Sequence, residues 1–190
     1  EAVLRKARWV HASGVSLAIS PTAEAAVRHA FAVAREAGVA ISLDTNFRER
    51  LWPAARARSV IDSLAGSANI VKTSMDDALR LTGLTDPATV AQFYRHLGAQ
   101  AVIVTRGAEG AYAATPEGEY QIPPHKVASV DATGAGDAFT GALIAERVRG
   151  AAWETALRFA NAAAALSTTG HGAVAPLPRR ADVEALLARG

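Results

Sequence analysis

Short apolar runs alternate along the chain with segments of helical periodicity, and this alternation limits the folds that the chain can adopt. Strands are expected at residues 8–11, 39–43, 69–71 and 101–105, of which the last (AVIVT) is the clearest. The helices expected between them cover residues 21–37, 53–64, 75–81 and 88–97. Strands that are separated by helices and joined by short connections form a parallel sheet with right-handed crossovers. The pattern therefore predicts an α/β fold.

A hairpin and a group of helices are expected to complete the fold. Residues 111–114 and 119–122 flank the sequence Pro116-Glu117-Gly118, which is typical of a β-hairpin. The later helices are expected at residues 136–148, 152–167 and 180–188. Because no strand separates the last two, these helices should pack on one another. With 190 residues, half of them hydrophobic, the chain can form one domain.

Composition excludes several kinds of site and partner. The chain has no cysteine, so disulfides, thiolate zinc sites and cysteine nucleophiles are excluded. No apolar run approaches the roughly 20 residues that span a bilayer, and no secretory leader is found, so we expect a cytoplasmic protein without a membrane partner. The net charge is only +2 and the arginines are scattered, so no nucleic-acid partner is expected. The five histidines lack metal-ligand spacing.

Residues 131–139 (DATGAGDAF) form a glycine-rich turn that leads directly into a helix. The small residues expose successive backbone N–H groups, and the helix N-terminus adds partial positive charge, so the segment predicts an anion site that suits phosphate. Asp137 lies in the first helical turn, where an acid can simply stabilise the helix dipole. A carboxylate beside a phosphate is costly unless it handles a proton. Asp137 is therefore also a candidate base for a hydroxyl that attacks a terminal phosphate.

Two other glycine motifs that bind phosphate are excluded. The P-loop pattern GxxxxGK[ST] does not occur. A dinucleotide fingerprint needs a small residue where the bulky Phe139 stands, and no strand follows to supply a ribose-binding acid. Ligands of parallel sheets bind at the carboxyl ends of the strands, which here are followed by the candidate segments 44–48, 72–74 and 105–110.

These segments resemble a known family. DATGAGDAF resembles the C-terminal signature D-T-x-G-A-G-D of the ribokinase-like (PfkB) carbohydrate kinases, and residues 105–110 (TRGAEG) resemble that family's T-x-G-x-x-G nucleotide loop. Residues 44–48 (DTNFR) with Leu51-Trp52 are similar to the D-x-N-x-R…LW segment of 2-keto-3-deoxygluconate kinases and bacterial fructokinases. Residues 13–18 (SGVSLA) resemble a stretch of the deoxygluconate kinases and favour that group.

The resemblance implies a ribokinase-like fold, a parallel-sheet sandwich with helices on both faces. Residues 1–190 would be the C-terminal part of a single kinase domain, with the N-terminal portion and the lid over the sugar missing. The implied activity is the transfer of the γ-phosphate of ATP, with Mg²⁺, to a hydroxyl of a small sugar or sugar acid. The complete protein is expected to be a homo-oligomer, and this part alone is expected to be inactive and poorly soluble or oligomeric, with an apolar face exposed near Trp9, Val10, Ile41 and Leu43.

The resemblance also implies roles for individual residues. Asp137 would be the catalytic base and contact the substrate, and the amides of Gly134, Ala135 and Gly136 would form an anion hole. Arg48, positioned by Asn46, would contact the phosphates or the substrate. Asp131 and Thr133, with the loop at 169–173, would hold a monovalent cation such as K⁺. The residues implied to bind the nucleotide are Asn46, Arg48, Ser74, Thr105, Arg106, Gly107, Ala108, Glu109, Gly110, Gly136 and Asn161.

Several alternatives remain open from the residues themselves. Arg48 can be a surface arginine, residues 107–110 an ordinary hairpin, and Asn161 a packing or capping group. The family's N-x-x-E segment, which handles magnesium and phosphate, is replaced here by residues 74–77 (SMDD), in which Ser74 and Asp77 would be shortened equivalents. The first functional hypothesis is a 2-keto-3-deoxygluconate kinase that acts on the primary hydroxyl. The alternatives are a fructokinase, another sugar kinase of the family, or a catalytically silent nucleotide-binding fragment.

Overall fold

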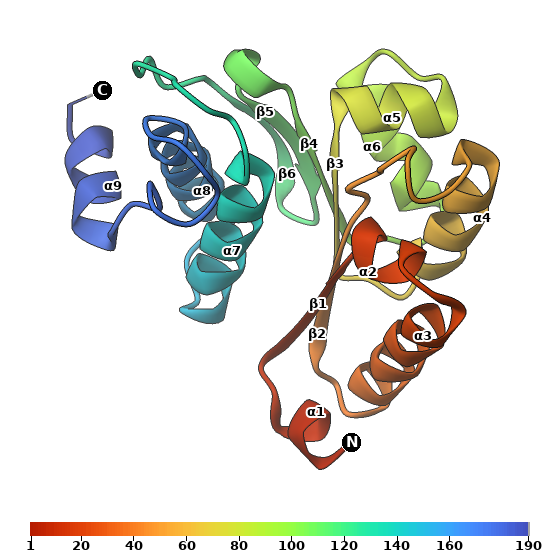
Figure 1. The fold of residues 1–190 in the computed structure, drawn as a ribbon. Helices are drawn as coiled ribbons and strands as arrows, with labels where there is room; N and C mark the ends of the chain where they lie inside the picture. Colours follow the sequence, from red (N-terminus) through yellow and green to blue (C-terminus); the bar gives the residue numbers. More distant parts are fainter. Residues whose placement is uncertain (190) are drawn as a thin grey trace. The chain divides into compact units, whose positions relative to one another are not determined.

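Six strands form one sheet in the computed structural model, which describes residues 1–189 (Figure 1). They are hydrogen-bonded in their order along the chain, and their bounds are β1 Trp9–Ser13, β2 Ala40–Asp44, β3 Ile70–Ser74, β4 Ala101–Thr105, β5 Ala111–Thr115 and β6 Gly118–Ile122. Strands β1 to β4 are parallel, as the alternating pattern predicts. Only two residues join β5 to β6, a connection that pairs strands in antiparallel fashion, so the sheet is mixed.

The helices agree with the sequence prediction except for the shortest ones. Their bounds are α1 Ala2–Lys6, α2 Gly14–Ala18, α3 Pro21–Glu36, α4 Ala54–Ala65, α5 Met75–Thr82, α6 Pro87–His96, the 3₁₀ helix η1 Gly107–Glu109, α7 Ala135–Val148, α8 Trp153–Ser167 and α9 Arg180–Leu187. Helices α1, α2 and η1 are not predicted from the sequence, because elements of five residues or fewer are too short to show a helical period. Over residues 1–189, every helix is too short or too polar to span a membrane.

The described residues divide into two compact units. Unit 1 contains residues 1–105 and 112–119, and unit 2 contains residues 106–111 and 120–189. The assignment of residues 1–190 to a single kinase domain stays a prediction.

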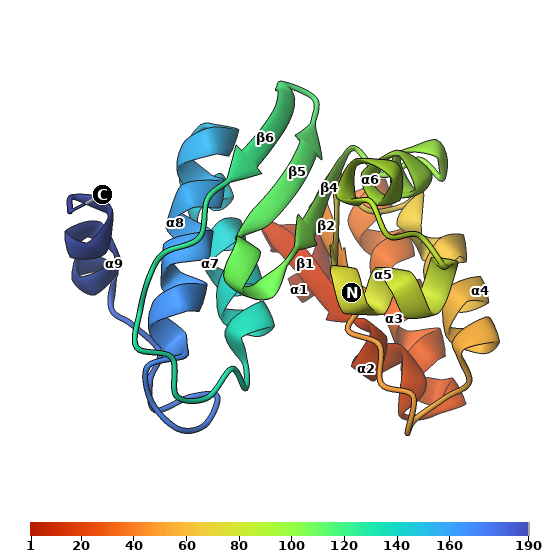
Figure 2. The same ribbon diagram turned by 90° about the horizontal axis from the view of Figure 1, so that it is seen from above.

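The core of unit 1 lies between its strands and the helices α2 to α6, which are on one side of those strands (Figure 2). Phe31 and Ala34 of the predicted stripe on α3 are buried there, with Val27 packed against them. Ile41 and Leu43 belong to the same core and are 1% and 0% exposed. The expectation that they form an exposed apolar face is therefore wrong, because the helices cover them. Trp9 and Val10 on the edge strand β1 are partly exposed, as expected.

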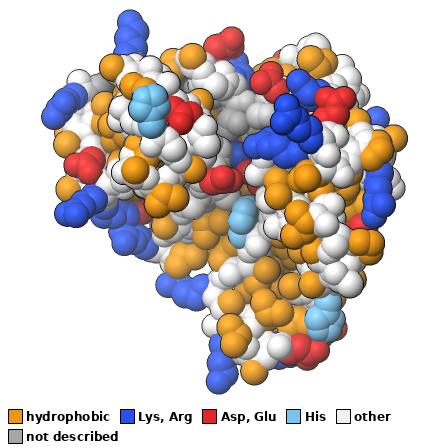
Figure 3. Space-filling model, viewed as in Figure 1, with side chains coloured by type: hydrophobic (Ala, Val, Ile, Leu, Met, Phe, Trp, Pro, Cys, Tyr) orange, Lys and Arg blue, Asp and Glu red, His pale blue; other side chains and the backbone are white. Residues whose placement is uncertain are grey.

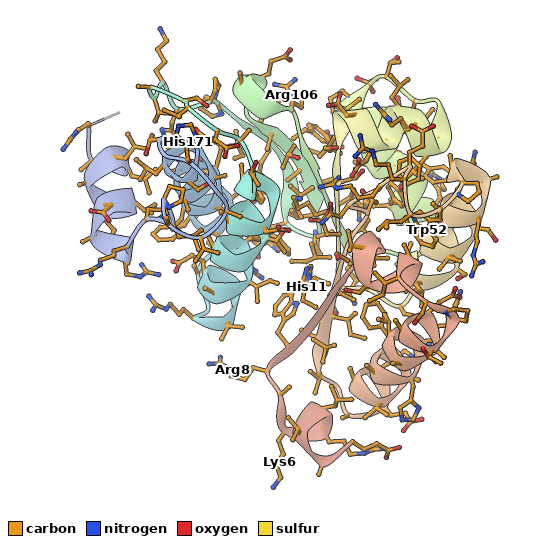
Figure 4. The ribbon with its side chains drawn as sticks, in the orientation of Figure 1. Lys6, Arg8, His11, Trp52, Arg106 and His171 are labelled. Carbon is orange, nitrogen blue, oxygen red and sulfur yellow. The ribbon has the colours of Figure 1, made fainter. Side chains whose placement is uncertain are left out.

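The other face of these strands carries polar side chains. Because side chains alternate along a strand, Ser42 and Asp44 point away from the core that contains Leu43. The Ser42 hydroxyl is 2.8 Å from Nδ1 of His11, which projects from β1 (Figure 4), and it accepts a hydrogen bond from Nε1 of Trp9 at 3.0 Å. Asp44 forms a buried ion pair with Lys72 of β3. Removing one partner of such a pair is strongly destabilising, since it leaves an uncompensated buried charge.

Unit 2 is built on the packing of α7, α8 and α9. The alanine-rich stretch of α8 allows this close packing, with Ala160 and Ala162 fully buried. Val183 of α9 packs in a cluster with Phe159 of α8. Arg180 fastens α9 further, because its guanidinium is bonded to the buried Glu146 carboxylate and lies 4.6 Å from the centre of the Phe159 ring. The prediction that the final helices pack on one another is confirmed.

Candidate functional site

The glycine-rich turn of unit 2 ends where α7 begins, and Gly134 is the residue that makes this junction possible. Gly134 is the N-cap of α7 and has a φ of 79°, in the left-handed region that favours glycine. A Cβ atom at this position would lie 2.7 Å from Cβ of Ala173, closer than side-chain carbons approach. The turn and the loop before α9 therefore meet so closely at this point that a side chain would force them apart.

The first amides of α7 differ in whether they are already used. The Ala135 amide donates to the Ala132 carbonyl at 3.1 Å, and the Ala138 amide donates to the Gly134 carbonyl at 2.8 Å. Within residues 1–189, no acceptor is found for the amides of Gly136 and Asp137. These two N–H groups stand at the positive end of the helix dipole, an arrangement that attracts anions. The Gly134 amide likewise has no acceptor among residues 1–189, whereas the Ala135 amide is engaged, and the anion hole at residues 134–136 stays a prediction.

Asp137 lies in the first turn of α7 and is exposed. It lines a cavity of about 450 Å³ that runs along α7, together with Gly134, Ala138 and Gly141. No hydrogen bond or ion pair holds its carboxylate within the part of the chain that the structure describes. An accessible carboxylate beside two unused amides can accept a proton from a group that approaches a bound anion.

The carboxylate of Asp131 braces the same turn. Its Oδ1 accepts hydrogen bonds from the amide and the hydroxyl of Thr133, at 2.9 and 2.6 Å, and its Oδ2 accepts one from the Gly172 amide at 2.8 Å. These bonds, that of the Thr133 hydroxyl first, lower the pKa of Asp131 to about 2. The oxygen atoms of this carboxylate, of Thr133 and of the adjoining loop are hard donors of the kind that K⁺ takes. The cation site stays a prediction.

The loop after β4 has the tight backbone that its two glycines predict. Gly107 and Gly110 have φ values of 56° and 84°, and a Cβ atom on Gly110 would lie 2.1 Å from the Ile122 carbonyl oxygen. Arg106, labelled in Figure 4, closes the loop, since its amide donates to the Gly110 carbonyl and its guanidinium to the Glu109 carbonyl, both at 2.8 Å. A role of residues 106–110 in nucleotide binding stays a prediction.

Two further predicted nucleotide contacts have partners of their own. In unit 2, Asn161 of α8 is 8% exposed, and its Nδ2 donates to the Pro123 carbonyl at 2.8 Å. This contact fits the packing or capping alternative for Asn161. In unit 1, the Thr105 hydroxyl donates to the Thr73 carbonyl over 3.4 Å, a long contact that leaves the hydroxyl available to a stronger partner.

The candidate site of unit 1 is the turn after β2. Asp44 Oδ1 accepts a hydrogen bond from the Asn46 amide at 3.2 Å, and Asp44 Oδ2 lies 2.7 Å from Nζ of Lys72. Asn46 has a φ of 33°. Arg48 follows at the surface, with its Nη1 donating to the Phe47 carbonyl at 3.0 Å. No bond between the side chains of Asn46 and Arg48 is found in residues 1–189, and the positioning of Arg48 by Asn46 stays a prediction.

Ser74 and Asp77 serve the local structure of α5 and of this turn. The Ser74 hydroxyl caps α5 by accepting a hydrogen bond from the Asp77 amide at 3.0 Å. Asp77 Oδ2 accepts hydrogen bonds from the Phe47 amide and the Thr45 hydroxyl, both at 3.1 Å. Burial raises the pKa of Asp77, and these two hydrogen bonds oppose the shift. Thr45, Phe47 and Lys72 lie in the candidate segments 44–48 and 72–74, but the sequence predicts no individual role for them. Their contacts appear only in the structure.

Charged side chains surround a cavity of about 440 Å³ beside the same turn. Its lining includes the three arginines Arg48, Arg50 and Arg80, as well as Glu49, Asp76 and Asp77. Figure 3 shows basic and acidic side chains next to each other over α5 and the loop that follows β2. The arginines give this surface of unit 1 donors for an anionic ligand. Over residues 1–189, no three His, Asp or Glu side chains come together as a metal site.

The family model described as pfkB family carbohydrate kinase matches residues 1–180. The chain is 38% identical over 184 residues to the 2-dehydro-3-deoxygluconokinase of Thermoproteus tenax, covering 95% of this chain and 55% of that protein. It is 35% identical over 195 residues to fructokinase-1 of Oryza sativa subsp. japonica, covering 97% and 60%. The chain therefore spans little more than half the length of these relatives.

A solved structure has the same fold. The aminoimidazole riboside kinase of Salmonella enterica, complexed with aminoimidazole riboside and an ATP analog, superimposes with a TM-score of 0.87 at 32% identity, covering 95% of this chain and 62% of that one. This match confirms the predicted ribokinase-like α/β fold. The similarity extends over nearly all of the chain, so both units are included in it.

Substitution of Gly134 tests the junction before α7. We expect Gly134→Ala to lower the free energy of unfolding by about 1–2 kcal/mol or more, because its φ is positive and Ala173 occupies the space of the new methyl group. Gly141→Ala is the matched control, since nothing lies within 4 Å of its Cβ position in the same helix. The control should raise stability by about 0.5–1 kcal/mol. Urea unfolding measures both, and equal effects would contradict the close approach.

The lowered pKa of Asp131 predicts a pH dependence of stability. A carboxyl group whose pKa falls on folding stabilises the native state above its unfolded value, here 3.8, and loses that contribution as the pH drops toward 2. Asp131→Asn should therefore be less stable than the unsubstituted chain at pH 6, and the difference should shrink as the pH falls below 4. Denaturant unfolding at several pH values measures it. A difference that is constant from pH 6 to pH 3 would contradict the bonding of this carboxylate.

Proposed function

The chain belongs to the pfkB family of carbohydrate kinases, and from this premise we propose that the complete protein transfers the γ-phosphate of ATP to a hydroxyl group of a sugar. The complete protein here means this chain together with the further length found in its relatives. The observation that carries the proposal is the start of α7, where two unused amides adjoin the accessible carboxylate of Asp137. An anion hole beside a base is what phosphoryl transfer to a hydroxyl requires.

Asp137 is proposed to act as the base. Its carboxylate accepts the proton of the sugar hydroxyl while the hydroxyl oxygen bonds to the γ-phosphorus and the bond to the ADP oxygen breaks. The amides at residues 136–137 donate hydrogen bonds to the oxygens of the transferring group, whose negative charge they and the helix dipole stabilise. Residues 106–110 of unit 2 and Arg48 of unit 1 are proposed to bind the nucleotide. The donors offered are the amides of Gly107 and Ala108, since the other three amides of the loop are bonded within it, and the Arg48 guanidinium; both kinds suit phosphate oxygens.

Two cations are proposed to accompany the reaction. Mg²⁺ is expected to arrive on the ATP phosphates and to neutralise their charge, since Mg²⁺ is usually held by substrate phosphates with few protein ligands. K⁺ fits the oxygen donors at Asp131, Thr133 and the loop at 169–173, where it would add positive charge close to the start of α7. The negative charge of this site comes from the Asp131 carboxylate, whose lowered pKa keeps it ionised at neutral pH.

The sugar is proposed to be 2-keto-3-deoxygluconate. The support is the 38% identity to the Thermoproteus tenax enzyme and the SGVSLA stretch at residues 13–18. The alternative is fructose, which the 35% identity to the rice fructokinase favours. Phosphorylation assays of the complete protein with ATP and each of the two sugars test the choice. We expect the higher kcat/KM with 2-keto-3-deoxygluconate, and ATP binding without turnover on any sugar would instead support a silent nucleotide-binding protein.

Substitution of Asp137 tests the chemistry. Asp137→Asn in the complete protein should lower kcat by about 10²–10⁴, the range for loss of a general base, while the affinity for ATP changes little. Glu154→Gln is the control, because Glu154 is also an acid in the first turn of a helix in unit 2 and contributes only to the dipole and to Arg158. Turnover above half of the unsubstituted value in Asp137→Asn would remove Asp137 from the role of base.

A further inference from the structure

The turn at residues 45–48 is held in a conformation that it would not adopt alone. Asn46 is the one residue other than glycine, among those described, with a positive φ, at 33°. Such a backbone persists only where the surrounding structure determines it, and such positions cluster at functional sites. The contacts that hold this turn therefore indicate which residues the site depends on.

One carboxylate holds the turn from the side of the strands. Asp44 is 2% exposed; its Oδ1 accepts from the Asn46 amide at 3.2 Å, and its Oδ2 is fixed by Lys72 at 2.7 Å. The Thr45 amide also donates to the Lys72 carbonyl at 2.9 Å. The backbone of Gly14 packs directly against the turn, since a Cβ atom on Gly14 would lie 2.0 Å from the Thr45 carbonyl oxygen. The backbone at Thr45 and Asn46 is therefore held by hydrogen bonds and by close packing against Gly14.

A second carboxylate holds the turn from the side of α5. Asp77 is 9% exposed, and its Oδ2 accepts hydrogen bonds from both the Phe47 amide and the Thr45 hydroxyl. The Thr45 hydroxyl lies a further 2.9 Å from the hydroxyl of Thr73 on β3. The two carboxylates thus accept from the N–H groups of two successive peptide bonds, Asp44 from that of Thr45–Asn46 and Asp77 from that of Asn46–Phe47.

These contacts continue to the exposed arginine. Asp77 holds the Phe47 N–H group, and on the other side of the Phe47 Cα atom the Phe47 carbonyl accepts a hydrogen bond from Nη1 of Arg48 at 3.0 Å. The guanidinium lines the charged cavity of unit 1 with Arg50 and Arg80. A hydrogen-bonded path therefore runs from the Asp77 carboxylate through one residue to the guanidinium that the proposed function assigns to ATP.

We propose that Asp77 is a positioning residue that sets the orientation of Arg48 through the backbone of Phe47, and that Asp77 does not handle magnesium. The inference rests on the proposed function, because it assigns to Arg48 a role in ATP binding. It differs from what the family pattern implied for residues 74–77. Asp77 lines the charged cavity, but the Oδ2 atom of its shorter side chain already has two donors within the fold, and Ser74 is used as the cap of α5.

Three variants of the complete protein separate positioning from magnesium handling. Asp77→Ala removes the acceptor, and Asp77→Asn keeps an acceptor oxygen but removes the charge. Glu36→Gln is the control, because Glu36 is an exposed acid of unit 1 that pairs with Arg5 and does not line the cavity. Hydrogen–deuterium exchange at the Phe47 amide reports on the turn directly. Calorimetric titration with ATP at several Mg²⁺ concentrations reports on the ligand, and the variant Arg48→Ala completes a double-mutant cycle with Asp77→Ala.

We expect Asp77→Ala to accelerate exchange at the Phe47 amide and to weaken ATP binding about tenfold to hundredfold, the effect of losing hydrogen bonds to a charged acceptor. The loss should disappear in the Arg48→Ala background, since a positioning residue acts only through Arg48. Asp77→Asn should bind ATP with the Mg²⁺ dependence of the unsubstituted protein, and Glu36→Gln should behave like the unsubstituted protein in every measurement.

Two results would overturn the inference: a clearly higher Mg²⁺ requirement in Asp77→Asn, or unchanged exchange at Phe47 in Asp77→Ala. The first needs no alanine variant, so the test stands even if Asp77→Ala does not fold. If the exchange behaves as expected while no form of the protein binds ATP, the proposed function fails and the positioning of Arg48 by Asp77 stands. The two failures are therefore distinguishable.

Discussion

The ion pair between Lys72 and Asp44 is the contact on which the candidate site of unit 1 depends. Both groups are almost completely buried, 5% and 2% exposed, at the carboxyl ends of adjacent parallel strands. Neither charge is stable there without the other, because desolvation of a lone ion costs far more than any single packing contact returns. The other oxygen of the carboxylate, Asp44 Oδ1, accepts a hydrogen bond from the Asn46 amide. A charge placed inside the sheet thus shapes the loop outside it.

In unit 2, the conformation of the turn before α7 depends mainly on backbone geometry and not on a buried ion pair. Its turn needs a residue with a positive φ and no Cβ atom at position 134, and a carboxylate at position 131 whose bonds reach the Gly172 amide. Once these conditions are met, α7 begins with two unused amides beside an acid. The electrostatic field of the site then comes from the helix itself, and it requires no basic side chain at that position.

Ser74 and Asn161, to which the resemblance assigns contacts with the nucleotide, both have hydrogen-bond partners within the fold. Ser74 is the N-cap of α5, where a hydroxyl that accepts from the amide of Asp77 contributes about 1 kcal/mol to stability. Asn161 is itself buried, and its Nδ2 donates to the Pro123 carbonyl, so its side-chain amide has a partner within the fold. The contact of Asn161 joins residues 38 positions apart in the chain, and sequence spacing does not reveal it.

The sequence by itself determined the order of strands and helices, the hairpin, the glycine-rich start of α7 and the family. These follow from periodicity, turn chemistry and short motifs, which act over a few residues and are therefore visible along the chain. The tertiary structure decided which amides of α7 are unused, that Ile41 and Leu43 are covered by helices, and that Asp77 faces the Phe47 amide 30 residues away. Those outcomes depend on which segments meet in space. Packing sets that, and a residue's type and neighbours in the sequence do not.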